Sequence, residues 1–151
     1  MNFKSLLDNL TKHNLTISTI ESLTGGGFAY FFTQTPGASK VFVKGLVTYS
    51  NEAKIDAGVN KDILKQYGAV SKEVALEMVS TLDTDIVISF TGNAGPDAMD
   101  DKPVGRVYIG IKFMEDIEIL EFNFEGDRDQ IREQSIKAAL DILEKNFQKL
   151  S

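Results

Sequence analysis

One short segment, Asp85 to Thr91 (DIVISFT), is apolar at nearly every position. A strand with one face in water alternates apolar and polar residues, so a continuously apolar strand is expected to be covered on both faces. Helices must then lie on both sides of the sheet. The rest of the chain agrees, because a helix is followed by strands mixed with helices, then by a hairpin and a long helix. The sequence predicts an α/β fold, a single-domain three-layer α/β/α sandwich with a mixed β-sheet over residues 1–151.

Hydrophobic periodicity gives the elements of this sandwich. The expected helices are 3–13, 24–32, 51–57, 61–67, 71–82 and 127–150, and the expected strands are 15–20, 41–49, 85–91, 104–113 and 117–124. Asp127 and Gln130 form a capping-box pattern at the start of the last helix. The 117–124 strand alternates imperfectly, which predicts a bulge or burial on both faces.

The overall composition is that of an ordinary globular protein, with 42% hydrophobic and 25% charged residues. No apolar run is long enough to cross a bilayer, and residues 1–6 do not have the pattern of a signal peptide. We therefore expect a cytoplasmic protein that does not bind membranes. The formal net charge of −6 argues against nucleic-acid binding, which needs a basic face.

The side chains available for chemistry are restricted. The sequence has no cysteine, which excludes disulfides, cysteine-zinc sites and a cysteine nucleophile. Its one histidine, His13, lies where the first helix is expected to end, and there it would interact favourably with the helix dipole. Nucleophilic chemistry would then depend on Ser, Thr, Asp or Lys, with a lysine or a carboxylate as the base.

A glycine-rich loop, ESLTGGG (Glu21 to Gly27), joins the first expected strand to a helix. Such a turn lies outside the carboxyl end of a sheet, where open α/β folds bind ligands. Free N–H groups there can hold an anion, and glycines let the backbone approach it closely. Ser22 would be placed much like the serine of a nucleophile elbow. The alternative is that Ser22 or Thr24 only caps the helix.

Two further polar loops also follow expected strands. In Tyr49-Ser50-Asn51-Glu52-Ala53-Lys54, the tyrosine ends a strand and the lysine lies early in a helix, so both could reach the edge that carries Ser22. A capped helix with a solvated lysine is the alternative. The segment TGNAGP, residues 91–96, follows the most apolar strand, where a Gly- and Pro-containing turn is expected in any case.

Two arginines, Arg128 and Arg132, share one face in the first turns of the last helix. The helix dipole disfavours cations at this end, although by only a few tenths of a kcal/mol. Either they pair with Asp127, Asp129 or Glu133, or they bind a phosphate or carboxylate group of a ligand.

Together these loops match a known family. The sequence resembles the C-terminal domain family of the competence/damage-inducible protein CinA, including its stand-alone members, the nicotinamide-mononucleotide amidohydrolases (deamidases). The matching segments occur in family order over about residues 3 to 147: ESLTGG, PGASKVF, YSNEAK, YGAVSKEVALEM, TGNAGP, KPVGRVYIG and FEGDR. The family's N-terminal domain, related to molybdopterin-binding proteins, has no counterpart in this sequence.

The resemblance implies an enzyme that converts nicotinamide mononucleotide, a small-molecule nucleotide substrate, to nicotinic acid mononucleotide and ammonia. It implies no metal and no other cofactor. Serine and lysine replace the histidine triad in this family, and here they are Ser22 as nucleophile and Lys54 as base. Lys54 then needs a pKa well below about 10.4. Tyr49 is expected to relay a proton or to pack on the pyridinium ring. Family members commonly self-associate, so a homo-oligomer, a dimer or larger, is expected.

Other positions are expected to bind the substrate. The backbone at Thr24 and Gly25 would hold the oxyanion, and Glu21 would orient Lys54 or contact the ribose. Arg128, together with Arg132, would bind the phosphate. The complete expected substrate-binding set is Glu21, Thr24, Gly25, Gly26, Thr91, Gly92, Arg128 and Arg132.

This sequence departs from the family pattern in the loop after TGNAGP, where Asp97 to Asp101 replaces the usual glycines. We expect a stiffer and more acidic loop that weakens phosphate binding. Asn93 also stands where an apolar residue or glycine is frequent. Two other functions remain compatible with the sequence: an amidase for another small amide, and a non-catalytic nucleotide-binding or regulatory module related to competence or DNA damage.

Overall fold

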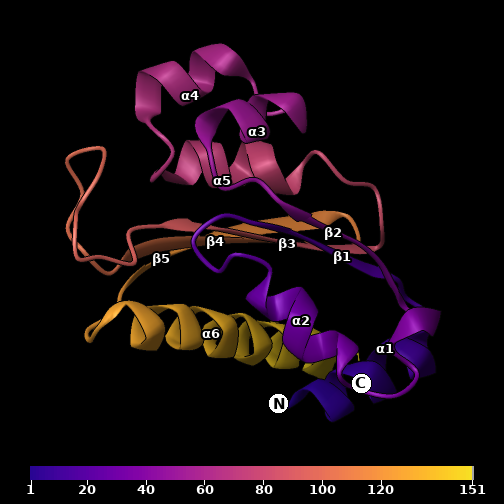
Figure 1. The fold of residues 1–151 in the computed structure, drawn as a ribbon. Helices are drawn as coiled ribbons and strands as arrows, with labels where there is room; N and C mark the ends of the chain where they lie inside the picture. The colour runs from indigo at the N-terminus through magenta and orange to yellow at the C-terminus, as the bar shows by residue number, and fades with distance from the viewer. Residues whose placement is uncertain (151) are drawn as a thin grey trace.

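The computed structural model describes residues 1–150 and has the predicted architecture, a single-domain α/β fold in which helices cover both faces of one five-stranded mixed sheet (Figure 1). The helices are α1 (Phe3–His13), α2 (Gly27–Thr33), α3 (Asn51–Asp56), α4 (Lys61–Tyr67), α5 (Lys72–Val79) and α6 (Arg128–Gln148), with a short 3₁₀ helix η1 (Ala38–Lys40). The strands are β1 (Ile17–Glu21), β2 (Phe42–Val47), β3 (Ile86–Gly92), β4 (Arg106–Phe113) and β5 (Asp116–Asn123).

The sheet has the strand order β2-β1-β3-β4-β5. Strand β1 lies between β2 and β3 and pairs in parallel with both, whereas β3–β4 and β4–β5 are antiparallel pairs. The carboxyl ends of β1, β2 and β3 therefore meet at one edge. The predicted apolar strand is β3, which is buried on both faces up to its last residue. Its position in the middle of the sheet, between β1 and β4, explains its composition.

Clusters of buried hydrophobic residues lie on both faces of the sheet. One layer, α1, α2 and α6, lies on one face of the sheet, and α3, α4 and α5 lie on the other (Figure 1). One cluster includes Phe28, Phe90 and Leu143, and another includes Ile20, Val74 and Met78. Ile17 and Ile20 of β1 belong to different clusters, because side chains three positions apart on a strand point to opposite faces.

Two local expectations are corrected. Strand β5 pairs with β4 in register over all of Asp116–Asn123, so it has no bulge, and it is not buried on both faces, because it is the edge strand of the sheet and is largely exposed. Helix α2 begins at Gly27 and not at Thr24, because residues 22–26 form a turn between β1 and the helix. The capping box of Asp127 and Gln130 at α6 is confirmed.

The end of α1 also agrees with its prediction. His13 is the last residue of α1, and its ring stacks on Phe147 of α6 with 5.8 Å between the ring centroids. Across residues 1–150, no helix combines the length and the apolar character that a membrane span requires.

Candidate active site

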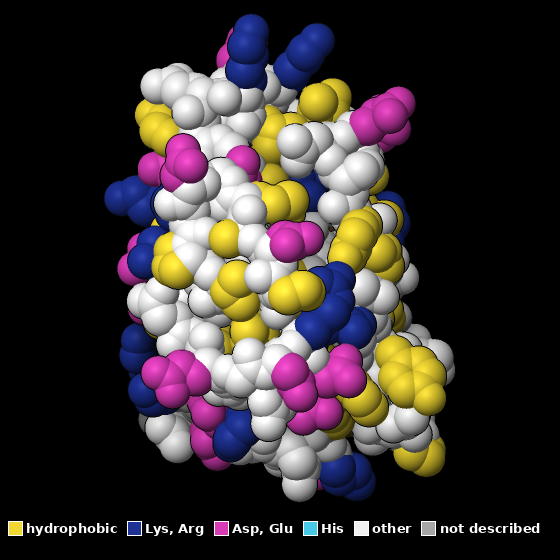
Figure 2. All heavy atoms as spheres, turned by 60° about the vertical axis from the view of Figure 1, so that its left-hand side comes forward, with side chains coloured by type: hydrophobic (Ala, Val, Ile, Leu, Met, Phe, Trp, Pro, Cys, Tyr) yellow, Lys and Arg dark blue, Asp and Glu magenta, His cyan; other side chains and the backbone are white. Residues whose placement is uncertain are grey.

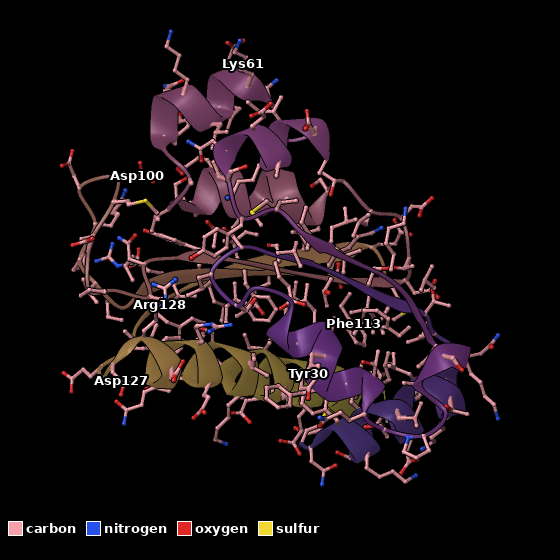
Figure 3. All side chains as sticks on the ribbon, in the orientation of Figure 1. Tyr30, Lys61, Asp100, Phe113, Asp127 and Arg128 are labelled. Carbon is pink, nitrogen blue, oxygen red and sulfur yellow. The ribbon has the colours of Figure 1, made fainter. Side chains whose placement is uncertain are left out.

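Three loops that follow parallel strands meet at one edge of the sheet. They follow β1 at Ser22, β2 at Thr48 and β3 at Asn93, and the first turn of α6 lies beside them. In Figure 3, Arg128 lies at the start of α6 near the level of the sheet, and Asp100 lies above it on the loop after β3. The sequence-based expectation that these segments converge is met by the parallel arrangement of β1, β2 and β3.

Ser22 and Lys54 are in direct contact. The Lys54 Nζ lies 3.0 Å from the Ser22 Oγ and donates a second hydrogen bond of 2.9 Å to the backbone carbonyl oxygen of Thr48. Ser50 caps the N-terminus of α3 by accepting a hydrogen bond from the N–H of Ala53. This cap fixes the short helix so that its lysine points inward beneath the loop after β1.

The environment of Lys54 disfavours its charged form. Its side chain is 1% exposed, and Ser22 is 8% exposed. Burial lowers the pKa of Lys54 from 10.5 to about 8, against the opposing influence of the negative charge of Asp100. An amine with this pKa is partly neutral near neutral pH, so it can accept a proton from a neighbouring hydroxyl.

Ser22 opens into a pocket of about 310 Å³. The pocket is lined by Ser22, Leu23, Tyr49, Gly92, Asn93, Ala94, Gly95, Pro96, Asp97, Met99 and Arg128. Arg128 crosses one side of it and donates hydrogen bonds of 2.6 Å to the Tyr49 hydroxyl and to the carbonyl oxygen of Gly95. The face of the molecule in Figure 2 carries hydrophobic side chains near its middle with both basic and acidic side chains next to them.

Tyr49 is well placed to contact a ligand in this pocket. Its side chain is 59% exposed, and it follows β2 as predicted. The hydroxyl that faces Arg128 has a partner, whereas the ring is available to pack against a bound group. The alternative in which Arg128 pairs with Asp127, Asp129 or Glu133 is not found; the partners of Arg128 are Tyr49 and Gly95.

The expected role of Glu21 is wrong. Its carboxylate is 0% exposed and accepts hydrogen bonds from the hydroxyls of Thr19 and Thr24 and from the N–H groups of Phe28 and Ala29. Glu21 therefore satisfies the first N–H groups of α2 instead of orienting Lys54 or contacting a ribose. The reason is strand geometry, because Glu21 and Ser22 are adjacent residues and point to opposite faces of the sheet.

The glycine turn is only partly available to an oxyanion. The N–H of Gly25 donates to the carbonyl oxygen of Ser22 at 2.9 Å. This N–H is therefore already paired, and the expected role of Gly25 as an oxyanion donor is wrong. Within residues 1–150, the N–H groups of Leu23 and Thr24 have no protein acceptor. Gly25 and Gly26 have φ values of 59° and 91°, the left-handed region that favours glycine, and this explains why the turn contains them.

Two expected ligand contacts at the end of β3, Thr91 and Gly92, have different surroundings in the structure. The Thr91 hydroxyl is buried and donates to the carbonyl oxygen of Ala69 at 2.6 Å, so it ties β3 to the turn before α5 and does not face the pocket. Its substrate-binding assignment is therefore corrected. Gly92 does line the pocket, and a Cβ at this position would lie 2.6 Å from the carbonyl oxygen of Arg106.

Arg132 does not share the pocket of Arg128. It donates to the carbonyl oxygen of Thr24 at 3.1 Å and pairs with Asp129 at 3.8 Å. It lines a separate hollow of about 160 Å³ beside Phe31. The expectation that both arginines bind one phosphate is therefore wrong for Arg132, and the alternative of pairing within the helix is found.

Three residues near the site were not given a role from the sequence. Thr48 holds Lys54 through its backbone carbonyl oxygen. Because any residue has this group, the contact leaves no signal in the sequence. Asn93 bonds through its amide to the backbone of Met99 and Lys102, and Asp100 influences Lys54 by its charge. Asn93 and Asp100 both belong to the positions where the sequence departs from the family pattern, which was the available signal.

Neither of two further features points to another centre. A hollow of about 460 Å³ lies between the β4–β5 turn and the end of α6, at the opposite edge of the sheet, and it contains none of the expected site residues. Over residues 1–150, His, Asp and Glu side chains do not gather in a group of three or more that could hold a metal ion.

Comparison with known proteins identifies the family. The family model of the CinA C-terminal domain matches residues 3–147 of this sequence. A CinA-like protein of Fusobacterium nucleatum is 50% identical over 134 residues, covering 87% of this chain and 33% of that protein. A protein of Caldicellulosiruptor saccharolyticus that is named as competence-damage inducible is 47% identical over 148 residues, covering 94% of this chain and 36% of that protein. The chain thus spans about a third of the length of these two relatives.

A solved structure agrees with the sequence relatives. The crystal structure of a competence or damage-inducible protein from Enterobacter asburiae superposes with a TM-score of 0.92 at 28% sequence identity, covering 96% of this chain and 95% of that chain. Fold, family model and relatives all lead to one assignment, and the chain belongs to the CinA C-terminal domain family.

Proposed function

We propose that this protein hydrolyses the carboxamide of nicotinamide mononucleotide to nicotinic acid mononucleotide and ammonia, with Ser22 as nucleophile and Lys54 as its base. The observation that carries the proposal is the 3.0 Å contact between the Ser22 Oγ and the Lys54 Nζ at the bottom of a pocket. A buried lysine whose pKa is lowered to about 8 has little structural purpose next to a serine, but it suits proton transfer.

In the proposed reaction, the Ser22 Oγ attacks the carboxamide carbon and its proton passes to the Lys54 Nζ. The tetrahedral intermediate then collapses, and the nitrogen leaves as ammonia after taking the proton from Lys54. Water attacks the resulting ester and Lys54 accepts a proton from it. When the ester bond breaks, that proton returns to the Ser22 oxygen, and the carboxylate product is free to leave.

The remaining groups of the pocket have complementary roles in this proposal. The N–H groups of Leu23 and Thr24, which have no protein acceptor within residues 1–150, are the donors for the oxyanion. The Tyr49 ring forms a wall for the pyridinium ring. Arg128, already held by two hydrogen bonds, is the cation for the phosphate.

Product formation by a serine variant tests the proposal. Intact protein is expected to release ammonia and nicotinic acid mononucleotide in equal amounts from nicotinamide mononucleotide, and Ser22→Ala is expected to lose at least about 10³-fold in kcat. The matched control is Ser39→Ala, on the 3₁₀ helix η1 and outside the pocket. Unchanged turnover in Ser22→Ala would remove the nucleophile assignment. Absence of turnover in the intact protein would remove the substrate assignment.

The pH dependence gives a second prediction. Lys54 acts as a base only when it is neutral, so kcat/KM is expected to rise with pH and level off above a midpoint near the Lys54 pKa of about 8. The negative charge of Asp100 raises that pKa, so Asp100→Asn is expected to move the midpoint to lower pH. An asparagine oxygen can still accept the hydrogen bond that Asp100 receives from the N–H of Val70.

The control for the pH profile is Asp101→Asn, which removes an exposed charge from the next position of the loop. The profile of this variant is expected to match that of the intact protein more closely than the Asp100→Asn profile does. A midpoint that stays fixed or rises in Asp100→Asn would show that Asp100 does not act on the base.

A further inference from the structure

The pocket carries charges of both signs. Arg128 is one lining residue, and Asp97 is the one carboxylate among the lining side chains of this described pocket. Asp97 is exposed and, within residues 1–150, makes no hydrogen bond or ion pair through its side chain. A residue with an unpaired carboxylate that lines a pocket together with an arginine is available to a ligand.

The loop that carries Asp97 is held in a defined shape. Asn93 is 2% exposed, and its amide donates to the carbonyl oxygens of Met99 and Lys102 and accepts from the N–H of Met99. Asp100 accepts a hydrogen bond of 3.0 Å from the N–H of Val70, which fastens the loop to the α4–α5 turn. Figure 3 shows Asp100 on this side of the loop, above Arg128. These contacts hold the loop at Asn93, Met99, Asp100 and Lys102, on either side of Asp97.

The proposed chemistry determines which part of the substrate lies here. The carboxamide carbon must reach the Ser22 Oγ, and the aromatic ring is bonded directly to that carbon. The ring must then lie among the nearest walls of the pocket, where Leu23, Ala94 and Met99 provide apolar surface. A pyridinium ring carries a positive charge, and moving that charge from water to apolar surface beside Arg128 is unfavourable without a counter-charge.

We infer that Asp97 is a specificity-determining residue that selects amide substrates with a positively charged ring over neutral ones. The inference rests on the proposed function, since it places the ring by the position of the carboxamide at Ser22. Asp97 does not touch the reacting carbon and does not take part in proton transfer. Its contribution is the electrostatic attraction of the ring.

Binding measurements test the inference without turnover. The probes are nicotinamide mononucleotide, with a cationic ring, and its dihydro form, which has the same ribose, phosphate and carboxamide but a neutral ring. Calorimetric titrations use full-length Ser22→Ala protein with and without Asp97→Asn. Asp97→Asn is expected to weaken binding of the cationic nucleotide by about fivefold to tenfold and that of the neutral one by less than about twofold. The difference is expected to shrink as salt is added.

Asp101→Asn in the same background is the matched control, because it removes one charge from the same loop outside the pocket lining. It is expected to change both affinities by less than about twofold. Equal weakening of both nucleotides by Asp97→Asn, or no weakening of either, would overturn the inference, as would the failure of both to bind. The turnover of intact protein is measured separately. If intact protein forms nicotinic acid mononucleotide but Asp97→Asn has no charge-selective effect on binding, the proposed function stands and only this inference is rejected.

Discussion

Replacing Lys54 with methionine is expected to lower kcat/KM for nicotinamide mononucleotide by at least about 10³-fold, because the serine then has no base within reach. No lysine and no histidine is among the lining residues of the pocket, and the one lining carboxylate, Asp97, makes no hydrogen bond to Ser22, whose described side-chain partner is Lys54. Methionine has similar length and keeps the buried volume filled with apolar atoms. The measurement is kcat/KM by ammonia release, with circular dichroism to verify folding.

Two other lysine variants separate proton transfer from simple charge. Lys54→Arg is expected to be as inactive as Lys54→Met, since a guanidinium group stays protonated and cannot accept a proton. Lys61→Met, on the exposed start of α4, is expected to have the activity of intact protein. Activity that survives in Lys54→Arg would contradict a role as base and would leave Lys54 with a hydrogen-bonding role only.

The fold was predictable because its main signals are local. Continuous apolarity of β3, helical spacing in α1 and the capping box of α6 each follow from neighbouring residues, and they require a sheet with helices on both faces. The convergence of the strand-end loops follows from parallel pairing. The contact of Ser22 with Lys54, 32 positions apart, is long-range, and it was anticipated through the family resemblance and not through spacing.

Several site assignments failed for geometric reasons that differ from residue to residue. The alternation of a strand could have excluded Glu21, because its neighbour Ser22 already faces the pocket. The Thr91 hydroxyl instead donates a hydrogen bond to the carbonyl oxygen of Ala69 on the α4–α5 turn. No local sequence pattern predicts that Ala69 lies next to Thr91. Arg132 lies four residues after Arg128, and about 6 Å of rise along a helix is enough to place it in a different hollow.

The acidic loop after β3 shows a different kind of limit. The sequence shows that this loop is acidic, but composition does not reveal which of its acidic residues lines the pocket. The backbone turns the three acidic residues in different directions: Asp97 lines the pocket, Asp100 binds the N–H of Val70, and Asp101 lies outside the pocket. The single expectation that the acidic loop weakens phosphate binding is therefore replaced by two separate, testable roles, one for Asp97 and one for Asp100.

The largest expected effect on stability comes from Glu21, the residue whose predicted role was corrected. Four donors converge on its buried carboxylate: two threonine hydroxyls and two N–H groups of α2. Glu21→Gln keeps the shape of the side chain but replaces one acceptor oxygen with a donor, so donors that met that oxygen lose their partner in a region without water. Hydrogen bonds to a charged group contribute about 1.5–3 kcal/mol each, and a buried group left unpaired costs about 1–3 kcal/mol.

We therefore expect Glu21→Gln to lower the free energy of unfolding by about 3 kcal/mol and the Tm by about 6–12 °C. Urea denaturation and a thermal scan measure the two quantities, with Glu115→Gln on the exposed β4–β5 turn as the matched control. Because Glu21 holds the start of α2 and the turn that carries Ser22, kcat is expected to fall in Glu21→Gln even at temperatures where the protein remains folded. A stable variant with unchanged kcat would mean that the carboxylate neither supports the turn nor compensates the donors around it.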